Sequence, residues 1–318
     1  MKHILAIGTA TLLLATPVQA EPGKWTDEPV RIVVTFPPGG TSDLIARVLA
    51  QYFESEYGQK AVVDNRPGAG GTVAADFVAE QGPDGTTLIL GNNAPFTIAP
   101  TQFEELPYDP MGDFTHIAYL GASTPALFVQ PSSGITSIED YIARANGDGI
   151  TYGSSGVGSI THILGQAVDV ALEIEQIHVP YQGSAPAIQD FRAGVLEAYY
   201  DMVALNGDLI TEGETQPIAL AAPERSPLFP DIPTFRELGH DIVIENWTGV
   251  SAPAGMDPEM VKTINDTIGA IMQMEPVIEQ LAKFGIAHTP MTSEEFTAFV
   301  EGTITTWAPL IRAAKVNG

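Results

Sequence analysis

The stretch 29–43 reads PVRIVVTFPPGGTSD and contains the signals that decide the fold. Its first residues, 29–35, are mostly β-branched and apolar, which predicts a buried strand. The PPGG run at 37–40 ends that strand, and Thr41 or Ser42 can cap the helix predicted to follow. A strand, a glycine-rich loop and a helix in this order form the repeating unit of α/β folds.

The same unit recurs along the chain and predicts two doubly wound lobes. We expect further strands at 61–64, 86–90, 125–129, 150–153, 177–180, 195–200 and 217–221. Helices are expected at 73–80, at 137–145, from 159, from 184 to 193, and at 258–274, 276–284 and 293–314. This order predicts parallel sheets with helices on both faces.

Two crossings of the chain, near 120–125 and 246–253, indicate that the second lobe is inserted into the first. We therefore expect an α/β protein with lobe 1 at 21–123 and 249–318 and lobe 2 at 124–248. A double crossing acts as a hinge, and ligands bind at the carboxyl ends of parallel strands.

The first twenty residues have the pattern of a secretory signal peptide. Lys2 precedes an uncharged apolar run, and Val18 and Ala20 place small residues before a cleavage site after Ala20. The run is too short to span a bilayer, and no cysteine near the cleavage site offers a lipid attachment point. We expect a soluble protein exported to the periplasm.

The composition argues against several kinds of site. The chain has 39 acidic and 14 basic side chains, a formal net charge of −25, and nucleic acids are bound through Lys and Arg clusters. It has no cysteine, which excludes disulfides and thiolate metal sites. The histidines lack zinc spacing, and the phosphate-loop, dinucleotide and nucleophile-elbow motifs are absent. We expect no nucleic-acid partner, no cofactor, no metal and no catalytic residue.

Four loops that follow strands share Gly, Ser, Thr or Asn and contain no Lys or Arg; they are 36–43, 91–96, 153–162 and 181–187. At least three precede a helix, whose first turn offers unpaired N–H groups and partial positive charge. Such a terminus can hold a carboxylate without a basic side chain. Each loop alone has the character of an ordinary turn, but four of matching chemistry, two in each lobe, favour a shared cleft.

Three side chains beside these loops have their own interpretations. Asp43 most simply complements the dipole of its helix. His162 is either a capping or packing residue or a ligand contact. Asp201, at the end of a strand, either receives a ligand ammonium group or hydrogen-bonds to backbone.

Several motifs occur together in an order typical of one family. They are VVTFPPGGTSD (33–43), DNRPGAGG (64–71), PDGTTL (83–88), LPYDP (106–110), GVGSITH (156–162), HVPYQGS (178–184) and FPDIPT (229–234). Over nearly the whole mature chain, the protein resembles the periplasmic binding proteins of tripartite tricarboxylate transporters, also called Bug proteins. The resemblance implies a Venus-flytrap fold like that of type II periplasmic binding proteins. It also implies capture of organic carboxylates by backbone N–H groups and ordered waters, and delivery to a membrane permease of one large and one small subunit.

Carried to this sequence, the resemblance and the loops together assign sixteen candidate ligand-binding residues. These are Phe36, Gly40, Thr41, Ser42, Asp43, Asn92, Asn93, Ser154, Ser155, Gly156, Ser159, His162, Gly183, Ser184, Ala187 and Asp201. The loop NNAPF at 92–96 departs from the small hydroxyl residues of many relatives. Phe96 either admits an aromatic or longer acid or belongs to the core, and Tyr199 and Tyr200 allow the same two interpretations.

The leading hypothesis is a monomeric solute-binding protein for a small mono- or dicarboxylate that works by domain closure. A sensor that presents its closed form to a receptor is the first alternative. A secreted serine hydrolase using His162 is the second, and it needs a base and an orienting carboxylate that the sequence does not supply at a recognisable spacing.

Overall fold

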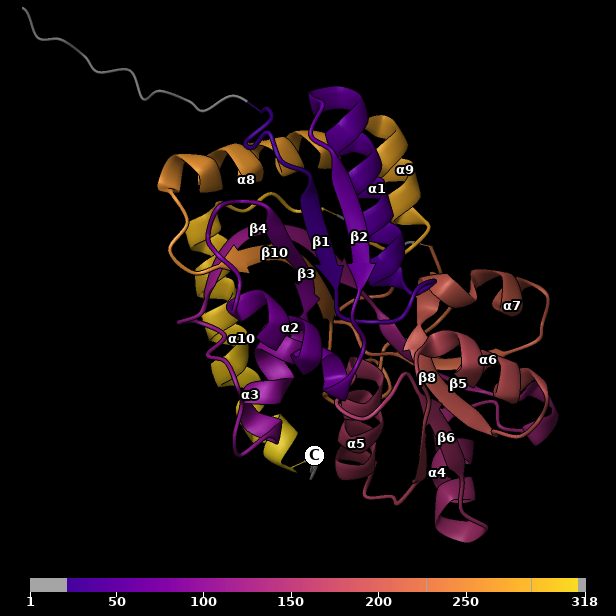
Figure 1. Ribbon diagram of the computed structural model, residues 1–318. Helices are drawn as coiled ribbons and strands as arrows, with labels where there is room; N and C mark the ends of the chain where they lie inside the picture. Colours follow the sequence, from indigo (N-terminus) through magenta and orange to yellow (C-terminus); the bar gives the residue numbers. More distant parts are fainter. Residues whose placement is uncertain (1–21, 227, 287, 314–318) are drawn as a thin grey trace, which may run out of the picture.

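The computed structural model describes residues 22–226, 228–286 and 288–313, and the predicted signal peptide lies outside the described residues. Two five-stranded sheets form two lobes, the first at the upper left and the second at the lower right of Figure 1. The first sheet has the order β2-β1-β3-β10-β4, and the second has the order β7-β6-β8-β5-β9. No helix among the described residues is long and apolar enough to cross a bilayer.

The strands of the first sheet are β1 (Val30–Val34), β2 (Ala61–Asn65), β3 (Thr87–Asn92), β4 (Phe114–Ser123) and β10 (Asn246–Pro253). Those of the second are β5 (Pro125–Val129), β6 (Thr151–Ser154), β7 (Ile177–Pro180), β8 (Ala198–Met202) and β9 (Gln216–Leu220). The helices are α1 (Thr41–Tyr57), α2 (Thr72–Ala79), α3 (Ala99–Gln102), α4 (Ile138–Gly147), α5 (Ile160–Leu172), α6 (Ser184–Arg192), α7 (Gly207–Thr211), α8 (Pro258–Met272), α9 (Glu275–Ala282) and α10 (Ser293–Ala313).

Strand β1 is apolar on both faces because helices cover both faces of its sheet. Val30, Ile32 and Val34 pack in one cluster with α1, α8 and α9. Val33 points the other way and packs with α2 and α10. This alternation is the two-residue period of a strand, applied to a sheet buried on both sides.

The expectation of all-parallel sheets is wrong, because both sheets are mixed. β10 runs antiparallel to β3 and β4, and β5 runs antiparallel to β8 and β9. The reason is the double crossing: β4 leads into the second lobe, β10 leads back, and the two strands pair in opposite directions. We keep the lobe boundaries at 123/124 and 248/249 as a prediction; β10 itself begins at Asn246.

Two of the three expected helix caps are confirmed. Ser137 and Ser159 accept hydrogen bonds from the third residue of α4 and α5, respectively. The cap of α1 is Gly40, so the expectation that Thr41 or Ser42 caps this helix is wrong. The chain turns at Gly39 with a φ of +93° and enters the helix through extended Gly40. Thr41 and Ser42 therefore lie in the first turn, where their hydroxyls are free for other contacts.

Helix α10 extends from one lobe to the other. It packs on β4 of the first sheet, and its C-terminal end lies beside α5 of the second lobe (Figure 1). Ile311 near that end is part of the second lobe's core, as is Ile98 from the π-helical turn Ala94–Ile98. The two lobes are therefore joined by packing as well as by the two crossings.

Candidate ligand-binding site

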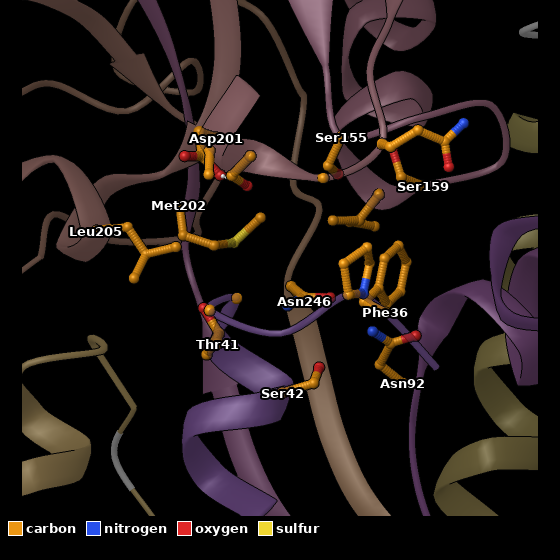
Figure 2. Close-up of a pocket in the computed structure, with 18 of the residues that line it drawn as sticks. Phe36, Thr41, Ser42, Asn92, Ser155, Ser159, Asp201, Met202, Leu205 and Asn246 are labelled. Atoms are coloured by element: carbon orange, nitrogen blue, oxygen red, sulfur yellow. Dashed lines mark hydrogen bonds between the residues drawn. The ribbon is translucent and has the colours of Figure 1, made fainter. Parts of the chain in front are cut away.

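The cleft between the lobes contains a cavity of about 140 Å³. At about 30 Å³ per water molecule this is room for about five waters or for a small organic acid. Both lobes contribute to its wall, and Figure 2 shows Ser42 and Asn92 of lobe 1 opposite Ser155 and Asp201 of lobe 2. None of the described residues that line the cavity is Lys or Arg.

The structure brings ten of the sixteen candidate residues to this wall. They are Phe36, Gly40, Thr41, Ser42, Asn92, Ser155, Ser159, Gly183, Ser184 and Asp201. They come from the carboxyl ends of β1, β3, β6, β7 and β8 and from the helix starts that follow, which is where doubly wound folds bind ligands. The other six, Asp43, Asn93, Ser154, Gly156, His162 and Ala187, do not line it.

The first turn of α1 offers hydrogen-bond donors to the cavity. No side chain caps this helix, so the N–H groups of Thr41 and Ser42 point out of its N-terminal end. Ser42 is only 8% exposed, and its hydroxyl points toward the opposite lobe (Figure 2). That hydroxyl has no hydrogen-bond partner within the described chain. The hydroxyl of Thr41 is fully buried and also lacks a partner among the described residues.

Two neighbours complete the lobe 1 side. The Asn92 side-chain oxygen accepts a hydrogen bond from the Ala94 N–H at 3.0 Å, which leaves its amide nitrogen directed toward the cavity (Figure 2). Asp43 is buried behind the helix start, where it accepts from the Gly39 N–H and the Arg47 Nε, both at 3.0 Å. Burial opposes ionisation of Asp43, but these hydrogen bonds hold its pKa below the usual value. The negative charge of Asp43 is thus already neutralised by Arg47.

The lobe 2 side is built around a buried carboxylate. Asp201 is 2% exposed, and it accepts from the Ser184 hydroxyl at 2.7 Å and from the Asn206 side-chain amide at 3.2 Å. Burial raises the pKa of Asp201 in spite of these hydrogen bonds. No Lys or Arg of the described chain forms an ion pair with it. Asp201 therefore hydrogen-bonds to protein side chains. It also faces the cavity, and its contact with a ligand ammonium group stays a prediction.

The hydroxyl groups of the loop after β6 form hydrogen bonds within that loop. Ser159 accepts from the His162 N–H at 3.3 Å and donates to the Gly156 carbonyl at 2.7 Å. The Ser155 and Thr161 hydroxyls form a mutual hydrogen bond of 2.9 Å. These contacts hold the loop in one shape and place Ser155 and Ser159 at the cavity wall.

His162 supports this loop from behind. Its ring stacks on His178 with the centroids 4.0 Å apart, and its Nδ1 accepts from the Gly158 N–H at 3.2 Å. Burial, followed by the charge of His178, lowers the pKa of His162 to about 3, and burial lowers the pKa of His178 to about 4. Of the two interpretations of His162, the structure supports packing.

The Ser154 hydroxyl lies 2.6 Å from the Nε2 of His178, which is the spacing of a nucleophile and its base. Ser154 is fully buried at 0% exposure, however, and substrate cannot reach it. No carboxylate of the described residues hydrogen-bonds to His178. The pair lacks the access and the third group that a hydrolase needs.

The remaining candidates belong to the packing around the cavity. Asn93 donates from its side chain to the Glu245 carbonyl at 3.1 Å, and Ala187 is buried beside Gly153. Gly156 lines a neighbouring cavity that opens along the same cleft. Phe96 is fully buried and packs on Trp247 in the core of lobe 1, and the Tyr199 and Tyr200 rings are buried in lobe 2.

Sequence reasoning missed three wall residues that lie outside the four predicted loops: Met202, Leu205 and Asn246. Met202 and Leu205 follow Asp201 and form an apolar side of the cavity (Figure 2). Asn246 begins β10, at the second crossing between the lobes. A polar residue at a predicted hinge next to a predicted cleft was the one available signal for Asn246.

Three comparisons with known proteins agree with this geometry. A family model described as the tripartite tricarboxylate transporter family receptor matches residues 45–316. Protein BugT of Bordetella pertussis is 31% identical over 313 residues, which is 97% of this chain and 95% of BugT. Among solved structures, Rpa4515 of R. palustris with adipate is 30% identical with a TM-score of 0.86 and covers 92% of this chain and 98% of its own. MatC from Rhodopseudomonas palustris with bound malate is 27% identical with a TM-score of 0.82 and covers 89% and 98%.

The chemistry of the cavity is that of an anion site without cations. Hydroxyls, three side-chain amides, the N–H groups of helix starts and the Asp201 carboxylate surround it. The described residues contain no group of three His, Asp or Glu side chains that could hold a metal ion. Such a site binds through directed hydrogen bonds, because it has no opposite charge to offer.

Proposed function

Because the chain belongs to the tripartite tricarboxylate transporter receptor family, we propose that it captures a small organic carboxylate between its lobes and delivers it to the membrane permease of such a transporter. Members of this family are binding proteins and not enzymes. The fold is the type II fold of periplasmic binding proteins, as the resemblance implied. The hydrolase alternative is therefore withdrawn.

One observation carries the proposal: the interlobe cavity is lined from both lobes by hydroxyls, side-chain amides and uncapped helix starts, and by no basic side chain. Micromolar binding requires about 8 kcal/mol. Each charge-assisted hydrogen bond contributes roughly 1.5–3 kcal/mol, so three or four of them reach that value before ordering costs. The ten candidate residues at the wall are the ones we propose to contact the ligand.

Domain closure is the proposed mechanism. The lobes approach each other closely at two glycines: a methyl group on Gly183 would lie 3.9 Å from the Pro37 side chain, and one on Gly70 would lie 3.5 Å from the Gly158 carbonyl. A ligand that touches both lobes binds the closed form better than the open form, and it shifts the population toward closure. The permease would then receive the closed protein.

We further propose that the protein works as a monomer in the periplasm, after removal of its signal peptide. The signal-peptide pattern of the first twenty residues supports export. The carboxylates in the solved relatives, adipate and malate, support the substrate class.

A thermal-shift screen against organic acids, followed by titration calorimetry, tests the function. We expect at least one small carboxylate to raise the melting temperature and to bind with a stoichiometry of about one. Stabilisation by sugars or metal cations and by no carboxylate would contradict the proposal.

A further inference from the structure

The two walls of the cavity differ in what they offer a ligand. We propose that lobe 1 binds the ligand's only carboxylate, and that Ser184 and Asp201 of lobe 2 accept a hydrogen bond from a donor at its other end. The substrate class is then a monocarboxylic acid with a terminal ammonium or hydroxyl group. This inference rests on the proposed function and deepens it.

The lobe 1 wall presents donors. The α1 helix of 17 residues starts at the cavity with no side-chain cap, so its first N–H groups and the positive end of its dipole face the ligand. The Ser42 side chain is more than nine-tenths buried, points into the cavity and has no partner within the described chain. The amide nitrogen of Asn92 points the same way (Figure 2). A carboxylate satisfies all of these groups at once.

The Asp43 carboxylate does not compete for this position. It lies outside the cavity wall, and Arg47 neutralises it at a distance of 3.0 Å. The donors of the first turn that face the cavity therefore remain available for an anion from outside.

The lobe 2 wall differs by a buried carboxylate, Asp201, which lies beside the uncapped start of α6. Ser184 uses its only hydroxyl proton on Asp201, which leaves oxygen lone pairs for the ligand. Asp201 has no cation partner in the described chain, and it sits beside the first turn of α6, whose positive end it already complements. Pro186 in that turn has no N–H to offer. A second ligand carboxylate here would meet the charge of Asp201, whereas an ammonium or hydroxyl group would find an acceptor.

A matched series of acids tests, in the full mature protein, which end group of the ligand each lobe binds. Butanoate, 4-hydroxybutanoate, 4-aminobutanoate and butanedioate share one carboxylate and differ only in the far group. The same four end groups on chains of three, five and six carbons remove length as a variable. We expect the hydroxy or amino acid of the best-fitting length to bind at least tenfold more tightly than the plain acid and the diacid by titration calorimetry.

The amino acids and the hydroxy acids of the series distinguish between the two kinds of donor, ammonium and hydroxyl. Tighter binding of the amino acid assigns an ammonium to the lobe 2 wall, and tighter binding of the hydroxy acid assigns a hydroxyl. A diacid that binds more tightly than both overturns the inference. Binding of a diacid with proton uptake, measured in buffers of different ionisation enthalpy, would also overturn it, because Asp201 would then act as a donor.

Two variants locate the effect. Asp201→Asn should reduce the advantage of the amino acid over the plain acid by tenfold or more. Ser42→Ala should weaken the binding of all four acids by a common factor, because Ser42 contacts the carboxylate that they share. The Kd values of this variant can be compared even if Asp201→Asn fails to fold. Selective weakening of one end group by Ser42→Ala would overturn the assignment. If no acid of any length binds, the proposed function itself fails, which is a distinct result.

Discussion

Two serines lie in the first turns of helices on opposite sides of the cavity. Replacing them by alanine should change different properties, ligand affinity for one and folding stability for the other. Ser42 in α1 makes no hydrogen bond within the described chain, whereas Ser184 in α6 donates to buried Asp201 at 2.7 Å. Ser42→Ala should therefore remove a ligand contact and leave the protein's own hydrogen bonds intact. Ser184→Ala should remove a bond on which a buried carboxylate depends.

The magnitudes follow from these contacts. Loss of one hydrogen bond to a charged ligand costs about 1.5–3 kcal/mol, so Ser42→Ala should raise Kd by roughly 10- to 150-fold. Its free energy of unfolding should change by less than about 0.5 kcal/mol, because the substitution removes no hydrogen bond within the described chain. Ser184→Ala leaves an oxygen of Asp201 without its donor, which costs about 1–3 kcal/mol of folding stability.

Titration calorimetry with the tightest acid of the panel, together with urea unfolding of the ligand-free proteins, separates the two effects. Ser42→Ala should change affinity with little change in stability, and Ser184→Ala should clearly reduce stability. The reasoning is refuted if Ser42→Ala destabilises the ligand-free protein as much as Ser184→Ala does and leaves the affinity unchanged.

Three further predictions concern stability. Thr41→Val should stabilise the ligand-free protein by about 1 kcal/mol, because the buried Thr41 hydroxyl lacks a partner among the described residues. The control Thr267→Val removes a hydrogen-bonded hydroxyl and should destabilise the protein by a similar amount. Urea unfolding measures both changes in the free energy of unfolding, and changes of the same sign contradict this prediction. The pKa values of His162 and His178, about 3 and about 4 in the folded protein, lie below the usual 6.5, so the unfolded chain takes up protons first and stability falls as the pH drops from 6.5 toward 4. A double Gln variant should lose less stability over that range in pH-dependent calorimetric melts, and an unchanged slope would reject this assignment. Phe96→Ala should cost about 3–5 kcal/mol of stability because the ring is fully buried, while the Kd per folded molecule stays the same; a large change in Kd would place the ring at the ligand.

The sequence was informative where a local pattern determines local structure. The nearly continuous apolar run of β1 and the serine before α5 each act within a few residues, and both were predicted. Strands β4 and β10 were missed as strands because they exist through their pairing with each other, across more than a hundred residues of chain. Their antiparallel direction follows from the crossing path, which no local pattern encodes.

The same distinction applies to the site. Loops after parallel strands meet at one edge of a sheet, so the loops around Ser42, Ser155 and Ser184 could be placed in a common cleft from the sequence. The direction of each hydroxyl could not be predicted, because the partner of Ser184 comes from β8, seventeen residues away. Met202 ends β8, and Leu205 reaches the wall from the turn that follows this strand.

The central claim is that an acid draws two lobes together, and the distance between the lobes measures this directly. The chain contains no cysteine, so cysteines introduced at exposed Gln51 in α1 and exposed Thr211 in α7 take two spin labels without competition. We expect the distance distribution from pulsed electron spin resonance to become shorter and narrower when a binding acid saturates the protein. A distribution that stays unchanged at saturation would contradict the account.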